Sequence, residues 1–306
     1  MDISIVIPVY NSENILPKLL EEINNSLNGV IDSFEVILIN DRSKDDSWEV
    51  IKKLKQKYNF LIGINLRKNA GQHNAIMAGL NYAKGDVVIT MDDDLQHDPK
   101  YIIKLYNQIK SGYDVCYTKY NNRQHKKWKI LGSKFNNLVA SILIQKPKEL
   151  YLSSFKAISK DIKNEMIQYP TPYIYLDGMI LSITDNITTI EIEHKERLEG
   201  ESNYTFFKLL SLWTQMATNF SILPLRIATF LGITISLFSF LLGVYYIILK
   251  FLDKTFPEGW TSLIVIVLFF GGIILTSLGI IGEYIGRTYL QLNGKKQYTI
   301  KEVINE

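Results

Sequence analysis

Residues 87–96 run Val87-Val88-Ile89-Thr90-Met91-Asp92-Asp93-Asp94-Leu95-Gln96, an apolar stretch that ends directly in three carboxylates. The apolar half predicts a strand buried on both faces. Gly85-Asp86 before it and His97-Asp98-Pro99 after it mark the limits of this segment. Three carboxylates at one strand end repel one another, so a cation would compensate them. Aspartates two positions apart, with an amide oxygen nearby, suit a divalent ion that prefers oxygen ligands. A solvated acidic turn is the alternative interpretation.

Strand-like and helical patterns alternate along the first 120 residues. The strand-like runs fall at 3–8, 34–39, 61–65, 87–91 and 114–118, and the helical patterns near 15–27, 46–58, 71–83 and 99–110. Such alternation predicts an α/β fold with a mainly parallel sheet and helices on both faces. In open sheets of this kind, ligands bind beyond the carboxyl ends of the strands.

Polar clusters stand where the expected strands end. They are Pro8-Val9-Tyr10-Asn11-Ser12-Glu13, Asn40-Asp41-Arg42-Ser43, Arg67-Lys68-Asn69-Ala70-Gly71-Gln72-His73 and the triple aspartate. The cluster at 67–73 also opens a helical pattern, and backbone amides at a helix start suit a phosphate. Because the chain has no G-x-G-x-x-G or Walker pattern, dinucleotide-binding and P-loop interpretations are weakened.

Composition limits the other functional classes. The 306 residues include 34 Lys and Arg against 31 Asp and Glu, a net charge of +3, so no strong basic field favours nucleic acid. The single cysteine, Cys116, excludes an intramolecular disulfide and fits a reducing compartment. No basic segment followed by an apolar stretch precedes the first strand, so we expect no cleaved signal peptide.

Two uncharged stretches, 227–249 and 260–282, predict a membrane anchor. Each is long enough to cross a hydrocarbon core of roughly 30 Å as a helix. Arg226 precedes the first stretch, and Arg287, Lys295 and Lys296 follow the second, whereas the connecting loop balances Lys250 and Lys254 with Asp253 and Glu258. By the positive-inside rule these residues favour a two-span protein of the plasma (inner) membrane, with the domain before the spans and the tail after them in the cytoplasm. Glycines within 269–282 permit close contact between helices or between subunits.

These patterns divide the chain into five expected units. They are a domain at 1–204, an amphipathic juxtamembrane helix at 205–226, two transmembrane helices at 227–249 and 260–282, and a cytoplasmic tail at 283–306. A second amphipathic segment, 128–143, has a basic start and apolar residues three and four apart. Either amphipathic segment could lie on the lipid surface or cover the sheet.

Several motifs together resemble a known family. They are Pro8-Val9-Tyr10-Asn11, Asn40-Asp41-Arg42-Ser43, Asn69-Ala70-Gly71-Gln72-His73, Asp92-Asp93-Asp94-Leu95-Gln96-His97-Asp98-Pro99, Asn122-Arg123-Gln124, Ser133-Lys134, His194-Lys195-Glu196-Arg197, Gly200-Glu201-Ser202-Asn203-Tyr204, Pro224-Leu225-Arg226 and Gly282-Glu283-Tyr284-Ile285-Gly286-Arg287. In this order they resemble glycosyltransferase family 2, and within it the polyprenyl-phosphate glycosyltransferases, such as dolichol-phosphate mannose synthase and the bactoprenol-phosphate enzymes. The resemblance covers nearly the whole chain.

The resemblance implies a GT-A (Rossmann-like) domain that binds a nucleotide-sugar, with UDP as the expected carrier, through Mg²⁺ or Mn²⁺. Asp41 would face the base or ribose, and Pro8, Tyr10 and Glu13 would line the same pocket. Asp92 and Asp94, with Gln96, would hold the ion and the diphosphate. Arg123, Ser133 and Lys134 match positions that meet the lipid phosphate, and Arg197 would also approach the phosphates. Relatives form oligomers, so a homodimer or homotetramer is expected.

A polyprenyl phosphate acceptor would simplify the chemistry. A phosphate monoester is largely dianionic near neutral pH, so it can attack the sugar without a general base, whereas a sugar hydroxyl needs one. Transfer from a nucleotide-sugar to undecaprenyl phosphate would invert the anomeric centre in one displacement. The product would be a lipid-linked monosaccharide for cell-envelope glycans.

Alternatives remain at the level of residues and of function. Some bactoprenol glucosyltransferases carry an acidic residue just before an aromatic-basic pair, where this chain has Ser153-Ser154-Phe155-Lys156, and the nearest acidic candidate is Asp177. In a transferase with a sugar-hydroxyl acceptor, Asp177 would be the base. A third hypothesis is a membrane-anchored nucleotide-sugar-binding protein without catalysis. Individually, Glu13 could favour a helix start, Asp41 could be a turn residue or cap, and His73 a surface histidine.

Overall fold

The computed structural model describes residues 1–120, 147, 150–169, 174–193, 223–251, 259–294 and 296–305. The predicted site residues Arg123, Ser133, Lys134 and Arg197 lie outside these ranges. So do the amphipathic segment at 128–143 and residues 205–222 of the predicted juxtamembrane helix. The predictions on these residues are therefore untested.

All the strands and helices expected in the first 120 residues are present, and further elements follow them. Their bounds are β1 Ile3–Val9, α1 Leu16–Leu27, β2 Phe34–Asn40, α2 Ser47–Lys57, β3 Leu61–Leu66, α3 Gln72–Tyr82, β4 Val87–Thr90, a 3-10 turn Pro99–Tyr101, α4 Ile102–Lys110, β5 Val115–Tyr120, β6 Lys156–Ser159, α6 Lys160–Ile167, α7 Leu176–Ile183, β7 Ile187–Ile192, α9 Leu223–Phe251, α10 Trp260–Leu292 and β8 Ile300–Ile304. The strands are rich in β-branched residues, which pack well on a pleated surface.

The strands form one eight-stranded sheet in the order β7-β5-β6-β4-β1-β2-β3-β8. Strands β1 to β4 are parallel to their neighbours among themselves, whereas β6 is antiparallel to both β4 and β5, and β8 is antiparallel to β3. The sheet is of the α/β, GT-A-like type that the sequence predicts. Its central parallel strands bring their carboxyl ends to one edge.

Helices cover both faces of the sheet, because successive strand residues point to opposite sides. Ile5 and Ile7 of β1 pack with α1, α2 and α4, whereas Val6 packs with α3, α6 and α7. Helix α3 approaches the sheet closely at Gly79, where an added Cβ would clash with Cγ1 of Val6. The core on the Val6 face therefore fixes α3, whose first residues reach the carboxyl edge of the sheet.

The end of the chain returns to the sheet, which the sequence patterns did not predict. Helix α10 continues to Leu292, and Ile300–Ile304 then forms β8 beside β3. The backbone N–H of Arg67 also donates to the carbonyl of Thr299 over 2.7 Å. Residues expected as a separate tail thus complete the sheet, while the division of the chain into five units remains a prediction.

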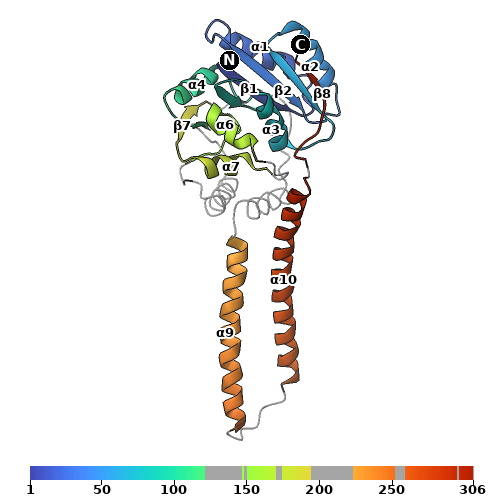
Figure 1. The fold of residues 1–306 in the computed structure, drawn as a ribbon, viewed down its shortest axis with the longest axis vertical. Coiled ribbons are helices and arrows are strands. Elements are labelled where there is room, and N and C mark those ends of the chain that lie inside the picture. Colours follow the sequence, from blue (N-terminus) through green and yellow to red (C-terminus); the bar gives the residue numbers. More distant parts are fainter. Residues whose placement is uncertain are drawn as a thin grey trace.

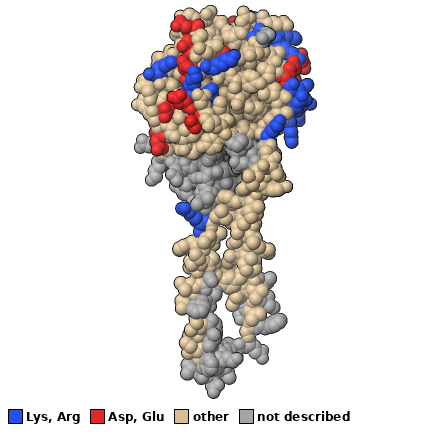
Figure 2. Space-filling view, in the orientation of Figure 1, with Lys and Arg blue, Asp and Glu red and all other residues tan. Residues whose placement is uncertain are grey.

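Helices α9 and α10 lie side by side and project from the domain (Figure 1). Large apolar side chains are exposed on both, including Phe230 and Leu275, and charged side chains cover little of their surface in Figure 2. By length and composition, Phe269–Leu290 is the one candidate membrane span among the described residues, and Leu225–Ile235 is a shorter apolar stretch. The two predicted spans at 227–249 and 260–282 therefore remain a prediction.

Candidate functional site

A cavity of about 320 Å³ lies where β1, β2 and β4 end and α3 begins. It is lined by Pro8, Val9, Tyr10, Asp41, Asn69, Gly71, Gln72, Asp92, Asp93 and Asp94. The structure thus brings together the polar clusters that the sequence places at strand ends. Five predicted site residues share this cavity: Pro8, Tyr10, Asp41, Asp92 and Asp94.

Asp93 ties the aspartate segment to the loop after β1. Its Oδ2 accepts a hydrogen bond from the backbone N–H of Tyr10 over 3.3 Å and another from the hydroxyl of Ser12. Burial raises the pKa of Asp93 to about 6, although the hydrogen bonds from Ser12 and Tyr10 oppose that shift. Asp93 therefore holds the aspartate segment against the loop after β1.

Asp92 is held on both carboxylate oxygens. Its Oδ1 accepts from Nε2 of Gln72 over 2.7 Å, and its Oδ2 accepts from the hydroxyl of Ser154 over 2.6 Å. Its backbone N–H donates to Nδ1 of His97 over 3.4 Å, and the ring of His97 stacks on Phe155 at 5.0 Å between centroids. These contacts fix the start of the aspartate segment.

Asp94 and Gln96 meet through the backbone. Oδ1 of Asp94 accepts from the N–H of Gln96 over 3.1 Å, and the intervening Leu95 has a left-handed φ of 59°. Non-glycine residues rarely adopt this conformation, which is found at functional sites where other contacts hold it. The side chain of Gln96 does not line the cavity, so its predicted role as a metal ligand remains a prediction.

Asp41 organises the loop that opens α3. Its carboxylate accepts from the N–H groups of Ala70, over 2.6 Å, and Gly71, over 2.9 Å. Asn69 donates from Nδ2 to the carbonyl of Asp41 over 3.0 Å. Burial raises the pKa of Asp41 while the two amides lower it. Gly71 has a φ of 84°, which favours glycine. The conformation of this loop therefore depends on both Asp41 and Gly71.

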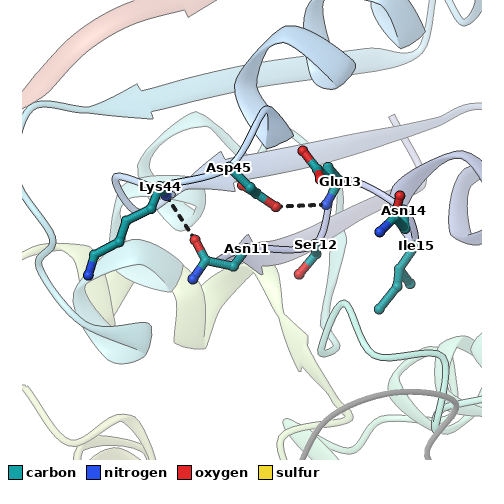
Figure 3. A pocket seen from close by; sticks show the side chains of 7 residues that line it. All are labelled: Asn11, Ser12, Glu13, Asn14, Ile15, Lys44 and Asp45. Carbon is teal, nitrogen blue, oxygen red and sulfur yellow. Dashed lines mark hydrogen bonds between the residues drawn. The ribbon is translucent and has the colours of Figure 1, made fainter.

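Glu13 lies in a neighbouring cavity of about 410 Å³, between the loops after β1 and β2 (Figure 3). Its Oε2 accepts from the N–H of Asp46 over 2.7 Å, and its own N–H donates to Oδ2 of Asp45 over 3.1 Å. Oδ1 of Asn11 accepts from the N–H of Lys44 over 2.8 Å in the same pair of loops. Glu13 thus supports the chain before α2 and does not line the aspartate cavity, although the prediction placed it in the same pocket as Tyr10.

Asp177 belongs to a buried polar cluster on the face of the sheet that α3, α6 and α7 cover. It is 9% exposed, accepts from the hydroxyl of Tyr117 over 3.0 Å and forms an ion pair with Nζ of Lys156. The ring of His73 packs edge-on against Tyr175 nearby, and desolvation lowers the pKa of His73 to about 4. Lys156 was not predicted as a partner, but a lysine inside an apolar strand pattern signals a buried anion.

The described residues contain no group of three or more His, Cys, Asp or Glu that could hold a metal ion by itself. Asp92 and Asp94 nevertheless both line one cavity and supply carboxylates to it. Mg²⁺ is often bound through one or two carboxylates together with substrate phosphates. The donor set therefore fits an ion that arrives with a diphosphate.

The comparisons with known proteins agree with this arrangement. Residues 4–171 match the family model of Glycosyl transferase family 2, and residues 223–288 match the GtrB C-terminal hairpin. An α/β sheet with an acidic cavity at its carboxyl edge and these matches define a glycosyltransferase. The chain belongs to glycosyltransferase family 2.

Similar proteins include two enzymes named undecaprenyl-phosphate 4-deoxy-4-formamido-L-arabinose transferase. The one from Proteus mirabilis is 34% identical over 305 residues, covering 99% of this chain and 94% of the relative. The one from Photorhabdus laumondii is 33% identical over 307 residues, with the same coverage. A glucosyl-3-phosphoglycerate synthase from Mycobacterium tuberculosis, solved with Mn²⁺, UDP-glucose and phosphoglyceric acid, is 17% identical, with a TM-score of 0.49 over 71% of this chain and 77% of that one.

Proposed function

We propose that this protein transfers one sugar from a UDP-sugar to undecaprenyl phosphate at a membrane. The observation that carries the proposal is the cavity that gathers Asp92, Asp93 and Asp94 with Asp41 at the carboxyl edge of the sheet. Relatives that match 99% of the chain are named as undecaprenyl-phosphate sugar transferases, which supports the same acceptor here. A non-catalytic binding protein is set aside, because the family and its relatives are transferases.

The donor would bind with its diphosphate against the aspartate segment. Asp92 and Asp94, assisted by Gln96, would hold Mg²⁺ or Mn²⁺, which when bound stabilises negative charge on the departing diphosphate. Pro8 and Tyr10 line the same cavity and would contact the nucleotide, while Asp41 shapes the loop at 69–71 beside it. The amides of Ala70 and Gly71 at the start of α3 already donate to the carboxylate of Asp41, so they add no site for phosphate oxygens.

The acceptor phosphate needs positioning more than activation. One of its oxygens would form a bond to the anomeric carbon while the bond from that carbon to the diphosphate oxygen breaks, and UDP leaves. The electron pair of that bond departs with UDP, so no proton has to move. Arg123, Lys134 and Arg197, assisted by Ser133, would hold the acceptor phosphate, because arginine suits bidentate phosphate contacts.

The helical pair α9–α10 supports a membrane location. We propose that both helices cross the plasma membrane, that the catalytic domain is cytoplasmic, and that the chains associate as a dimer or tetramer. Strand β8, which follows α10, lies in the catalytic sheet, so the carboxyl end of α10 lies beside that domain, which supports the proposed pair of crossings. A lipid-borne phosphate could then reach the site without leaving the membrane surface.

A second candidate keeps the fold and uses a sugar hydroxyl as acceptor, with Asp177 as base. A base must reach the proton that it removes. Asp177 is buried and already paired with Lys156 and Tyr117, which favours the phosphate acceptor.

The proposal is tested with the full-length protein in detergent, undecaprenyl phosphate, Mg²⁺ or Mn²⁺ and a panel of nucleotide-sugars that includes UDP-4-deoxy-4-formamido-L-arabinose. Mass spectrometry should detect a polyprenyl-phosphate monosaccharide and free UDP. Mild acid should release the sugar, because a glycosyl phosphodiester is more labile than most glycosides. Absence of transfer from every donor would contradict the proposal, and an acid-stable glycoside formed on a hydroxyl acceptor would support the second candidate.

A further inference from the structure

Two side chains from distant parts of the chain grip the carboxylate of Asp92, one on each oxygen. Gln72 donates from Nε2 to Oδ1 over 2.7 Å, and Ser154 donates from its hydroxyl to Oδ2 over 2.6 Å. They are 20 and 62 positions away from Asp92 in sequence. Both distances are short for their donor types, as expected when the acceptor is ionised.

Gln72 is itself held in place by the Asp41 loop. It is the first residue of α3 and directly follows Gly71, whose N–H donates to the carboxylate of Asp41 over 2.9 Å. The left-handed φ of Gly71, 84°, sets the direction in which α3 starts. The amide that reaches Asp92 is therefore fixed by a buried aspartate on another strand.

Ser154 is held equally firmly, by the strand that precedes Asp92. Its carbonyl accepts from the hydroxyl of Thr90 over 2.7 Å, and Thr90 is a fully buried residue at the end of β4. The segment then enters β6, which pairs antiparallel with β4. Ser154 and Asp92 thus stand on neighbouring, hydrogen-bonded segments.

We propose that Gln72 and Ser154 are positioning residues that orient Asp92 toward the divalent ion of the donor diphosphate, an inference that rests on the proposed metal role of Asp92. An ionised carboxylate has about four lone-pair sites on its two oxygens. One donor on each oxygen leaves the remaining sites for a cation. The two donors also counter the repulsion from Asp93 and Asp94 that would otherwise rotate the side chain away. Outer contacts of this kind typically change metal affinity by 10–100-fold when they are removed.

The test measures binding of Mn²⁺ in the presence of UDP, by calorimetry and by the electron paramagnetic resonance of the ion, on the full chain in detergent. Ser154→Ala and Gln72→Met should each weaken Mn²⁺ binding about tenfold, and Ser154→Thr, which keeps the hydroxyl, should restore it. In turnover, the Mn²⁺ concentration needed for half-maximal rate should rise by the same factor, whereas kcat at saturating Mn²⁺ should change less.

Ser153→Ala is the matched control. Ser153 accepts hydrogen bonds from Thr118 and from the N–H of Phe155, so its loss should lower stability without changing Mn²⁺ affinity. Mn²⁺ affinities of Ser154→Ala and Gln72→Met within twofold of the native value would overturn the proposal, as would an equal loss in Ser153→Ala. Because Mn²⁺ and UDP are the only probes in the binding assay, it does not depend on the sugar or the acceptor. A native protein that binds Mn²⁺ with UDP but transfers no sugar would contradict the proposed function alone.

Discussion

The indole Nε1 of Trp48 donates a hydrogen bond to Oε2 of Glu302 over 3.2 Å, and the two residues are 254 positions apart. Trp48 lies in α2 and Glu302 in β8. The bond therefore joins a helix near the start of the chain to the strand that follows α9 and α10. Glu302 also pairs with Asn65 of β3 in the sheet register. The last strand is thus part of the catalytic domain, and α10 is connected to that domain at its carboxyl end.

The contact between β8 and β3 predicts a specific stability defect. A Cβ added at Gly63 would lie 2.7 Å from Cγ1 of Ile304 and 2.8 Å from Cγ2 of Ile51. Gly63→Ala should therefore lower the free energy of unfolding by about 1–3 kcal/mol, measured by chemical denaturation of the detergent-solubilised protein. The double variant with Ile304→Ala should be less destabilised than the sum of the two single variants. Additive losses in the free energy of unfolding would show that a side chain at position 63 does not clash with Ile304.

The elements that local patterns specify could be predicted from the sequence. Strands at 3–8 and 87–91 are short β-branched runs bounded by turn residues, and clusters after parallel strands must meet at one edge. The cavity that unites Asp41 with Asp92 follows from these two facts. The position of this cavity could therefore be predicted without knowledge of any long-range contact.

What could not be predicted depends on pairing between distant segments. The antiparallel insertion of β6 and the return of β8 to β3 leave no signal in local periodicity. For the same reason, the sequence identifies Asp92 but not Ser154, and Asp177 but not its partner Lys156. Each partner depends on strand register, because a shift of one residue would turn every side chain of a strand to the opposite face of the sheet.

His73 should make stability depend on pH below neutrality. Its folded pKa of about 4 lies below the ordinary value of 6.5, because burial disfavours the charged ring. Between these values the unfolded chain binds the additional proton, so the stabilising contribution is complete above pH 6.5 and is lost as the pH falls toward 4. The loss amounts to at most about 3 kcal/mol. His73→Gln should show a smaller loss of stability than the native protein between pH 7 and pH 4.5.

This measurement compares two proteins, because another group opposes the effect. The pKa of Asp93 is raised to about 6, so protonation of Asp93 favours the folded state over the same pH range. The opposing contribution is present in both proteins and cancels in the difference. Identical pH profiles for His73→Gln and the native chain would contradict the assignment of a neutral, partly buried His73.

Adjacent aspartates should differ in what they do. Asp94→Asn should reduce kcat by about 10²-fold or more, because a neutral amide binds a divalent ion far less well. Asp93→Asn keeps an oxygen that can accept from Tyr10 or Ser12, so it should mainly cost about 1–2 kcal/mol of stability. Steady-state kinetics at several Mn²⁺ concentrations and thermal unfolding separate the two effects. Near-native turnover of Asp94→Asn would remove its metal role.

The ion pair between Asp177 and Lys156 allows the two acceptor chemistries to be separated. Asp177→Asn alone leaves the buried ammonium of Lys156 without its counter-charge, which should destabilise the fold by about 3–5 kcal/mol. The double variant Asp177→Asn/Lys156→Met removes both charges and should recover most of that loss. Lys163→Met, at another buried lysine that donates to the carbonyl of Ala83, is the control for removing a buried cation.

Activity of the double variant then decides between a structural carboxylate and a general base. If the acceptor is a phosphate, the folded double variant needs no base and should retain kcat within about tenfold of the native enzyme, because loss of a catalytic base costs 10²–10⁴-fold. Loss of the base would also remove the acidic limb of the pH–rate profile. A stable double variant whose rate falls by more than about 10²-fold would therefore assign Asp177 to proton transfer and favour a hydroxyl acceptor.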